Sequence, residues 1–245
     1  MKSQENKEDI TPVKINDIRF NLHTPNRSLK LCAKMNYETE NLDFINTIPD
    51  NSVLYDLGAC EGRFTVYAKV KGIKTYSFEP DPDNFDMLIK NLSLNKLSNE
   101  DIFNIAIGNK NEQKILTIGQ PWPGGHQKVI IDSDSNLRQD IKFTTAKEIS
   151  VDMMRLDDFI TNNKVEFPNF MKIDIDGSEL SFLEGALNTL KDKRLLKILF
   201  EVNVVDQNYS KILAILENCG LKEKMRYAIP NENEIFNILF SKKPL

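Results

Sequence analysis

A short glycine-containing segment is the first place where residue types and spacing indicate ligand chemistry. Residues 56–64 read DLGACEGRF and follow directly on an apolar run. Gly58 and Gly62 allow a tight turn that lets a ligand approach backbone N–H groups. Glu79 ends the next apolar run, about 20 residues on, where a carboxylate suits the two hydroxyls of a ribose. We therefore predict a nucleoside site, in preference to a ligand-free turn with Glu79 capping the next helix.

The turn also narrows the choice of nucleoside. Cys60 stands where the dinucleotide fingerprint G-x-G-x-x-G has its middle glycine. That glycine lets a pyrophosphate reach the backbone, so a ligand without phosphate does not need it. S-adenosylmethionine (SAM) has a ribose, an adenine and a charged amino-acid tail, but no phosphate. We expect Asp56 to bind the ammonium group of that tail, directly or through water.

The elements that must position these residues alternate along the chain. Apolar runs predict strands at 53–57, 75–78, 102–107, 170–175, 195–202, 221–228 and 234–240. Helices are predicted over 64–70, 81–94, 178–190 and 209–219, and Asp81 with Pro82 marks the start of the second. Continuous apolar strands between helices indicate a parallel sheet covered on both faces. The last strand–turn–strand pair predicts an antiparallel edge.

Two segments depart from this alternation. Residues 1–50 are predicted to be an N-terminal extension that packs on the core, with a frayed arm, strands at 15–20 and 29–31, and a helix within 37–48. Residues 109–150 contain short β-like runs at 114–118, 129–131 and 141–143, but no convincing helix. An insertion at the carboxyl end of a strand is expected to lie over the ligand crevice as a lid. The SAM-binding domain is accordingly predicted over 51–245.

Several longer motifs follow one another along the chain. They are YDLGA at 55–59, FEP at 78–80, NIAIG at 104–108, SVDMMRLDDF at 150–159, KIDIDGSE at 172–179 and LEGA at 183–186. In this order they resemble the FkbM-type SAM-dependent methyltransferases, over roughly residues 50–203. The family usually has Glu at the position of Asp176 and Ala at that of Ser178.

The resemblance implies a fold, a cofactor and a reaction. The fold is the Rossmann-like α/β class I methyltransferase fold: a mostly parallel seven-stranded sheet with an antiparallel last strand and helices on both faces. The reaction is methylation of a hydroxyl oxygen, of a sugar or glycan first and of another natural product as the alternative. The residues implied to hold SAM are Asp56, Gly58, Ala59, Gly62, Phe64, Glu79, Ala106 and Asp174. Phe64 has core packing as an equal alternative, and a non-catalytic SAM-binding protein is a third function.

The candidate catalytic residues lie at a strand end and in the insertion. Asp174 and Asp176 alternate at the end of a strand, so both carboxylates point to the same side. Asp174 is the favoured base, whereas capping of the next helix is an equal alternative for Asp176, with Glu179 three residues on. His126 follows PWPGG in the insertion and is the other candidate base, since histidine titrates near neutral pH.

A metal site is also compatible with the implied fold, at the ends of two neighbouring strands. Glu201 and Asn203 end the strand that lies next to the one ending at Asp174. Asp174, Glu201 and Asn203 would offer oxygen ligands to Mg²⁺, as in catechol-type O-methyltransferases. The pattern is not diagnostic, so metal dependence is the less favoured interpretation.

Composition limits the partners and the compartment. The 245 residues carry 32 Lys and Arg against 36 Asp and Glu, which argues against a nucleic-acid acceptor and for a small molecule or glycan. No apolar run approaches the roughly 18 residues needed to cross a bilayer. Three cysteines stand far apart without a C-x-x-C pair, and the first residues are polar, so we expect a cytoplasmic protein. An oligomer is compatible with the sequence.

Overall fold

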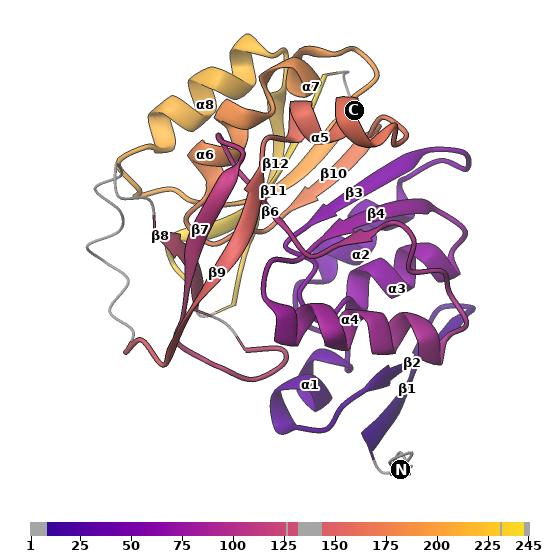
Figure 1. The fold of residues 1–245 in the computed structure, drawn as a ribbon. Helices are drawn as coiled ribbons and strands as arrows, with labels where there is room; N and C mark the ends of the chain where they lie inside the picture. Colours follow the sequence, from indigo (N-terminus) through magenta and orange to yellow (C-terminus); the bar gives the residue numbers. More distant parts are fainter. Residues whose placement is uncertain (1–8, 126, 132–143, 231, 243–245) are drawn as a thin grey trace.

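The computed structural model describes residues 9–125, 127–131, 144–230 and 232–242, and a seven-stranded sheet forms its centre (Figure 1). The strands are β3 (Val53–Leu57), β4 (Lys74–Phe78), β5 (Ile102–Phe103), β10 (Phe170–Ile173), β11 (Lys197–Asn203), β12 (Lys222–Ala228) and β13 (Ile235–Ser241). Their order is β12-β13-β11-β10-β3-β4-β5. Only β13 runs antiparallel to its neighbours; all other pairs are parallel. The predicted fold class is confirmed.

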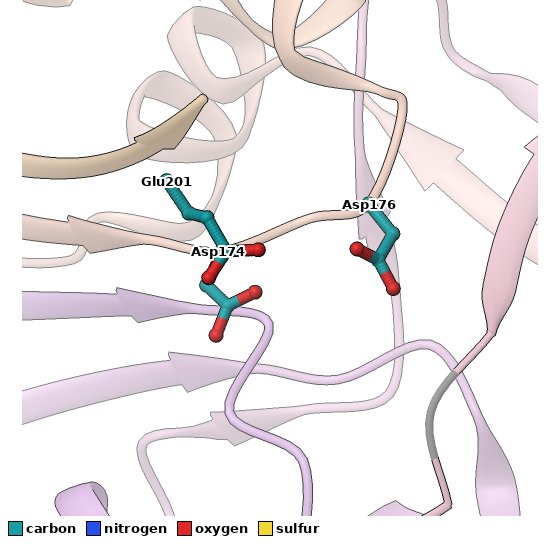
Figure 2. A group of neighbouring side chains, drawn as sticks. All are labelled: Asp174, Asp176 and Glu201. Atoms are coloured by element: carbon teal, nitrogen blue, oxygen red, sulfur yellow. The ribbon is translucent and has the colours of Figure 1, made fainter. Parts of the chain in front are cut away.

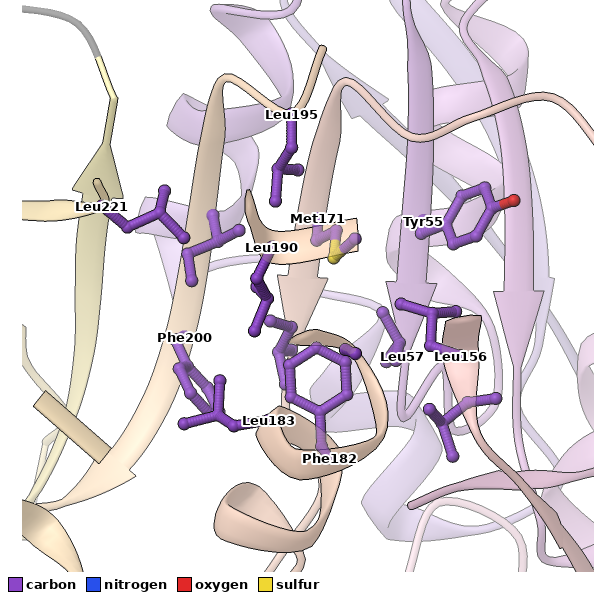
Figure 3. Close-up of a cluster of buried hydrophobic side chains, with 14 of the residues drawn as sticks. Tyr55, Leu57, Leu156, Met171, Phe182, Leu183, Leu190, Leu195, Phe200 and Leu221 are labelled. Carbon is purple, nitrogen blue, oxygen red and sulfur yellow. The ribbon is translucent and has the colours of Figure 1, made fainter. Parts of the chain in front are cut away.

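Two hydrophobic clusters, one on each face, bury the sheet. Every residue of β3 is buried, and alternate side chains enter opposite clusters, as the pleat requires. Tyr55 and Leu57 pack into the cluster of Figure 3, beneath helices that follow β9. Leu54 packs into the other cluster, beneath the helices of the first half of the chain. The sheet is thus covered by helices on both faces.

The helices begin close to where the sequence predicts, with two differences. Asp81 caps α4 by accepting from the Asp83 N–H, and Pro82 is its first residue. The single helix predicted over 178–190 is instead two helices that meet at Ala186, and α5 is a helix that no signal predicted. Among the described residues, no helix combines the length and apolar character that a bilayer crossing needs. The helices after the extension are α3 (Arg63–Val70), α4 (Pro82–Leu94), α5 (Leu156–Asn163), α6 (Glu179–Gly185), α7 (Leu187–Lys191) and α8 (Tyr209–Asn218).

The single strand predicted over 102–107 was wrong, because the structure has two short strands there, β5 and β6. The chain leaves the central sheet after β5, and Ala106–Ile107 forms β6, which pairs in parallel with β9 (Lys147–Met154) of a second sheet. Asn104 stands at the crossing, where its side-chain amide donates to the carbonyl oxygens of Glu79 (2.8 Å) and Pro80 (3.1 Å). These bonds tie the crossing to the loop after β4.

The second sheet has four strands in the order β6-β9-β7-β8, and it combines strands of the predicted insertion 109–150 with β6 and the end of β9 outside it. β7 (Glu112–Ile118) and β8 (Lys128–Ile131) include the predicted runs 114–118 and 129–131. The run predicted at 141–143 lies outside the described residues. β7 pairs with both β8 and β9, and a small apolar cluster that includes Ala106 and Ile118 stabilises it.

The N-terminal extension contains a hairpin and two helices. β1 (Ile10–Ile15) and β2 (Ile18–His23) pair antiparallel, so the strand predicted over 15–20 was wrong: Asn16, in the left-handed region, turns the chain there. The strand predicted at 29–31 is helix α1 (Arg27–Cys32), because Asn26 caps it by accepting from the Leu29 N–H. Helix α2 (Thr39–Asn46) lies within the range predicted for it.

The extension packs on the core through side chains of α4. Asn95 Oδ1 accepts from the Asn21 N–H at 2.8 Å, and Asn91 Oδ1 accepts from the His23 N–H at 2.7 Å. Figure 1 shows the hairpin and α1 beside α4. These bonds fix β2 to the C-terminal part of α4.

We predict that Gly185→Ala destabilises the fold, because α6 touches the chain after β6 at this residue. A Cβ on Gly185 would lie 1.8 Å from the carbonyl oxygen of Gly108. Relief of that collision is expected to lower the free energy of unfolding by about 1–3 kcal/mol, measured by urea denaturation. Ser178→Ala is the control, since Ser178 precedes the same helix without a side-chain capping bond. Equal stability of the Gly185→Ala variant and the wild type would contradict this packing.

Candidate active site

A cavity of about 500 Å³ opens at the carboxyl ends of the central strands. The glycine turn, Glu79, Ala106 and Asp174 line it, together with residues of β7 and β8. Ligands of open α/β sheets bind at this edge, where strand order reverses between β3 and its two neighbours. The volume lies in the range of sites for small molecules and cofactors.

The glycines of the turn are required for close packing. Gly58 has φ +75°, and a Cβ there would lie 1.7 Å from the carbonyl oxygen of Asp174. Gly62 has φ +85°, and a Cβ there would lie 2.1 Å from Leu88 Cδ1. The turn therefore sits directly on the end of β10 and against α4.

The sequence predicts that N–H groups of the turn face a ligand, but four of them donate to acceptors within the protein. The N–H groups of Gly58 and Ala59 both donate to the carbonyl oxygen of Phe78, at 3.0 and 3.1 Å. The Cys60 N–H donates to Glu79 Oε2 at 2.8 Å, and the Gly62 N–H donates to the Ala59 carbonyl oxygen at 2.9 Å. These four backbone donors are satisfied within the protein, so a ligand here must be held by other groups that line the cavity.

Glu79 lines the cavity, and its two carboxylate oxygens bond to different segments, the glycine turn and the loop after β4. Oε2 accepts from the Cys60 N–H at 2.8 Å, and Oε1 accepts from the Asp81 N–H at 3.0 Å. Each oxygen keeps a second lone pair for a hydroxyl donor. Burial raises the pKa of Glu79 to about 7, against the opposing effect of the Lys128 ammonium. The carboxylate fits a pair of ribose hydroxyls.

Asp56 lies below the cavity rather than on its wall. Its side chain is 1% exposed, and Thr65 Oγ1 donates to Asp56 Oδ2 at 2.6 Å. Lys172 Nζ lies 3.6 Å from Asp56 Oδ1 and 3.2 Å from Asp174 Oδ2. Direct contact between Asp56 and the ammonium of a bound SAM does not agree with this geometry, because Lys172 already occupies that carboxylate.

Lys172, the first residue of the KIDIDGSE motif, is a buried residue of the site. It is 4% exposed and donates to the Gly58 carbonyl oxygen at 3.4 Å, besides contacting the two aspartates. Burial by itself would lower the pKa of Lys172, but the Asp174 and Asp56 carboxylates outweigh it and the pKa is raised. A fixed positive charge therefore lies under the turn.

Three carboxylates meet at the other end of the cavity. One oxygen from each of Asp174, Asp176 and Glu201 lies within 4.8 Å of the other two (Figure 2). Burial raises the pKa of Glu201 well above its ordinary value, and the negative charges of Asp174 and Asp176 raise it further. The cluster can accept a proton, and its oxygens are also ligands of the kind that Mg²⁺ takes.

The structure adds detail to two predicted alternatives at this corner. Asn203 Oδ1 accepts from the Val205 N–H at 3.0 Å, and Asp176 lies beside Asp174 and Glu201. Ser178 is the N-cap of α6, without a side-chain capping bond. Asp176 lines the cavity.

Phe64 and Ala106 line the cavity as expected, and both are also core residues. Phe64 is 6% exposed and packs among residues of α2 and α3. The Arg63 guanidinium lies 4.6 Å from its ring centroid and the Lys172 ammonium 5.8 Å. The core packing of Phe64 is confirmed, and its contact with SAM stays a prediction. The other candidate base, His126, lies outside the described residues.

The N-terminal extension contributes two residues that the sequence analysis did not identify. Tyr37 and Glu38 line the cavity, and Glu38 has a left-handed backbone with φ 55°. Arg63 Nη2 lies 2.7 Å from Glu38 Oε2, and Arg63 Nη1 lies 3.4 Å from Glu61 Oε1. No local pattern marks Tyr37 or Glu38, because only packing across the fold brings them to the turn.

The insertion is fastened to the turn and to the extension. Asn84 Oδ1 accepts from the Gly124 N–H at 2.9 Å, and Asn84 Nδ2 lies 3.2 Å from Cys60 Sγ. From the extension, Asn26 Nδ2 donates to the Pro123 carbonyl oxygen at 3.0 Å, and Ser28 Oγ donates to that of Gly124 at 3.1 Å. Both contacts hold the start of the insertion beside the cavity.

Comparison with known proteins agrees with this geometry. A sequence profile of the methyltransferase FkbM domain matches residues 56–222, more than half of the chain. The chain belongs to the FkbM methyltransferase family. SAM is the methyl donor of such enzymes, and the FkbM chain has the side chains that fit it: Glu79 for a ribose and Phe64 beside the turn.

Similar proteins carry methyltransferase names. Methyltransferase 1 of Beauveria bassiana is 29% identical over 147 residues, which cover 56% of this chain and 59% of that protein. The hexuronic acid methyltransferase AglP of Haloferax volcanii is 22% identical over 169 residues, covering 67% and 62%. The chain thus spans less than two thirds of these relatives. A solved FkbM methyltransferase from Methylobacillus flagellatus shares the fold, with a TM-score of 0.51 at 19% identity, over 80% of this chain and 45% of that one.

We predict that Gly58→Ala costs more stability than Gly72→Ala. Both glycines have positive φ, +75° and +89°, but only a Cβ on Gly58 meets another atom. The backbone conformation alone is expected to cost Gly72→Ala about 1–2 kcal/mol. Displacement of the Asp174 carbonyl should cost Gly58→Ala about 1–3 kcal/mol more, measured by urea denaturation. Equal losses in the two variants would show that the turn does not press on β10.

We predict a pH-dependent affinity for the cofactor that depends on Glu79. With a pKa of about 7, Glu79 is a full acceptor for ribose hydroxyls only above that pH. The dissociation constant of S-adenosylhomocysteine is expected to rise by up to about tenfold per pH unit below 7, measured by calorimetry. Glu79→Gln should bind more weakly and lack this slope. The same slope in both proteins would assign the titration to another group.

Proposed function

We propose that this chain transfers a methyl group from SAM to a hydroxyl oxygen of a sugar, a glycan or a glycosylated metabolite. The observation that carries the proposal is the arrangement of one cavity, with the ribose-binding carboxylate of Glu79 at one end and the Asp174, Asp176 and Glu201 carboxylates at the other. Membership of the FkbM family supports the reaction. A relative named for hexuronic acid supports a sugar as acceptor.

The chain's own residues would chiefly provide position. SAM supplies an electrophilic methyl group when it is bound. Glu79, Phe64 and Ala106 line the cavity and would hold the cofactor, with the Glu79 carboxylate as acceptor for the ribose hydroxyls. Alignment of the acceptor oxygen with the reacting carbon can contribute roughly 7–11 kcal/mol to lowering the barrier.

Asp174 is the proposed proton acceptor. Lys172 holds its carboxylate at 3.2 Å, so the group is fixed at the end of β10. Glu201 lies beside it and can share the proton taken from the acceptor hydroxyl. His126 remains the second candidate base. Proton removal of this kind contributes about 10²–10⁴-fold in rate.

The charges of the cavity also support a small-molecule acceptor over a nucleic acid. Seven carboxylate side chains and three cationic side chains line it among the described residues: Glu38, Glu61, Glu79, Asp174, Asp176, Glu201 and Glu232 against Arg63, Lys128 and Lys172. A phosphate backbone would meet net negative charge at the cavity mouth. A natural product other than a sugar is the alternative acceptor.

The first experiment is calorimetric titration of the protein with SAM, beside Glu79→Ala. We expect saturable binding that the variant loses, since the ribose hydroxyls then have no acceptor. Radiolabelled SAM is then incubated with panels of glycosides and hydroxylated metabolites, with and without Mg²⁺. Saturable binding without transfer to any acceptor would favour a non-catalytic SAM-binding protein.

We predict that Asp174→Asn lowers kcat by about 10²–10⁴-fold at saturating SAM and acceptor. The amide keeps the shape of the carboxylate but cannot take the hydroxyl proton. Asp43→Asn, an exposed change on α2, is the control and should keep the wild-type kcat. Wild-type turnover by Asp174→Asn would exclude Asp174 as the base and direct attention to His126.

A further inference from the structure

The end of the cavity away from Glu79 has an unusual set of charges. Five carboxylate side chains line it, and they come from four separate parts of the chain: Glu38, Asp174, Asp176, Glu201 and Glu232. These carboxylates are close enough for the charge of one to shift the pKa of another. The pKa of Glu201 is raised by burial and then by Asp174, Asp176 and Glu38.

Tyr37 lies among the same carboxylates. Burial raises its pKa to about 12, and Glu38, Glu201 and Glu232 add to the rise. The side chain is 40% exposed and lines the cavity. An aromatic ring beside several carboxylates is the combination that binds an ammonium group, through the ring face and through charge.

The cations that line the cavity are already engaged. Arg63 pairs with Glu38 at 2.7 Å and with Glu61 at 3.4 Å. Lys172 pairs with Asp174 at 3.2 Å and with Asp56 at 3.6 Å. Lys128 pairs with Asp81, at the cofactor end. Among the described residues, every cation that lines this cavity has a carboxylate partner.

We propose that the acceptor end selects a hydroxyl compound that carries an ammonium group, such as an aminodeoxy sugar, over a neutral sugar, and rejects one that carries a carboxylate or phosphate. This inference rests on the proposed function, because it names the acceptor class of the same site. Glu38 and Asp174 pair with Arg63 and Lys172, so an anion would meet the negative charge of the remaining carboxylates while these cations are already engaged. An ammonium group would relieve the repulsion between the carboxylates. In this respect the chain differs from its relative named for hexuronic acid.

Three methyl glucosides that differ only at C6 test the proposal. They carry an ammonium group (6-amino-6-deoxyglucoside), a hydroxyl (glucoside) or a carboxylate (glucuronide). Binding to the protein saturated with S-adenosylhomocysteine is measured by NMR titration at pH 7, and methyl transfer is measured in parallel with SAM. We expect the amine to bind at least about tenfold more tightly than the glucuronide, with the neutral glucoside between them.

A charge reversal at the rim gives a matched pair of variants. Glu232→Lys should weaken binding of the amine by at least about fivefold and strengthen that of the glucuronide. Glu234→Lys is the control, because Glu234 is exposed two residues away and does not line the cavity. It should leave both affinities unchanged.

The outcomes separate this inference from the proposed function. Binding of the amine without transfer to any acceptor would support the selectivity and overturn the proposed reaction. Equal or tighter binding of the glucuronide would overturn the selectivity, and so would the binding of none of the three. Glucuronide binding that appears only with Mg²⁺ would also overturn it, because the carboxylates would then serve a metal ion.

Discussion

The buried ammonium group of Lys172 is the interaction on which the rest of the site depends. It lies between the carboxylates of Asp56 and Asp174 and donates to the carbonyl oxygen of Gly58. Lys172 and Asp56 are register partners on adjacent parallel strands, so the contact joins β10 to β3 at the carboxyl edge. Each carboxylate would be costly to bury alone, and loss of one partner from a buried charge cluster destabilises the remaining charges strongly. The charged triad therefore positions the turn, the strand end and the proposed base together.

Around this centre, the two ends of the cavity have different origins. The cofactor end is built locally, from one strand–turn–helix unit and from Glu79 at the end of the neighbouring strand. The other end is assembled from distant segments: Tyr37 from the N-terminal extension, Glu201 from β11 and Glu232 from the turn between β12 and β13. Because its walls come from segments that are far apart in the sequence, a substitution in one of them can change the charge of the second end while the cofactor end stays the same. This division explains how proteins of one family can share a cofactor and differ in acceptor.

Much of the fold was predictable because its signals are local. The apolar run at 53–57 is β3 to the residue, and Asp81 with Pro82 starts α4 as expected. The errors have two causes. The run at 102–107 divides between two sheets because a long-range partner, β9, pairs with β6. The apolar pattern at 29–31 lies on a helix because of a local signal, the Asn26 cap. Sequence periodicity does not report which partner a short strand will choose.

The sequence by itself determined the nucleoside end of the site: the glycine turn, the carboxylate after the second strand and the family order of the motifs. These features depend on residue type and on spacing within about 20 residues, which the chain fixes before it packs. Only the tertiary structure decided that Asp56 pairs with Lys172 and that Asp176 lies beside Asp174 and Glu201. Strand register and packing across the fold set these contacts, and a shift of one residue would turn each side chain to the opposite face of the sheet.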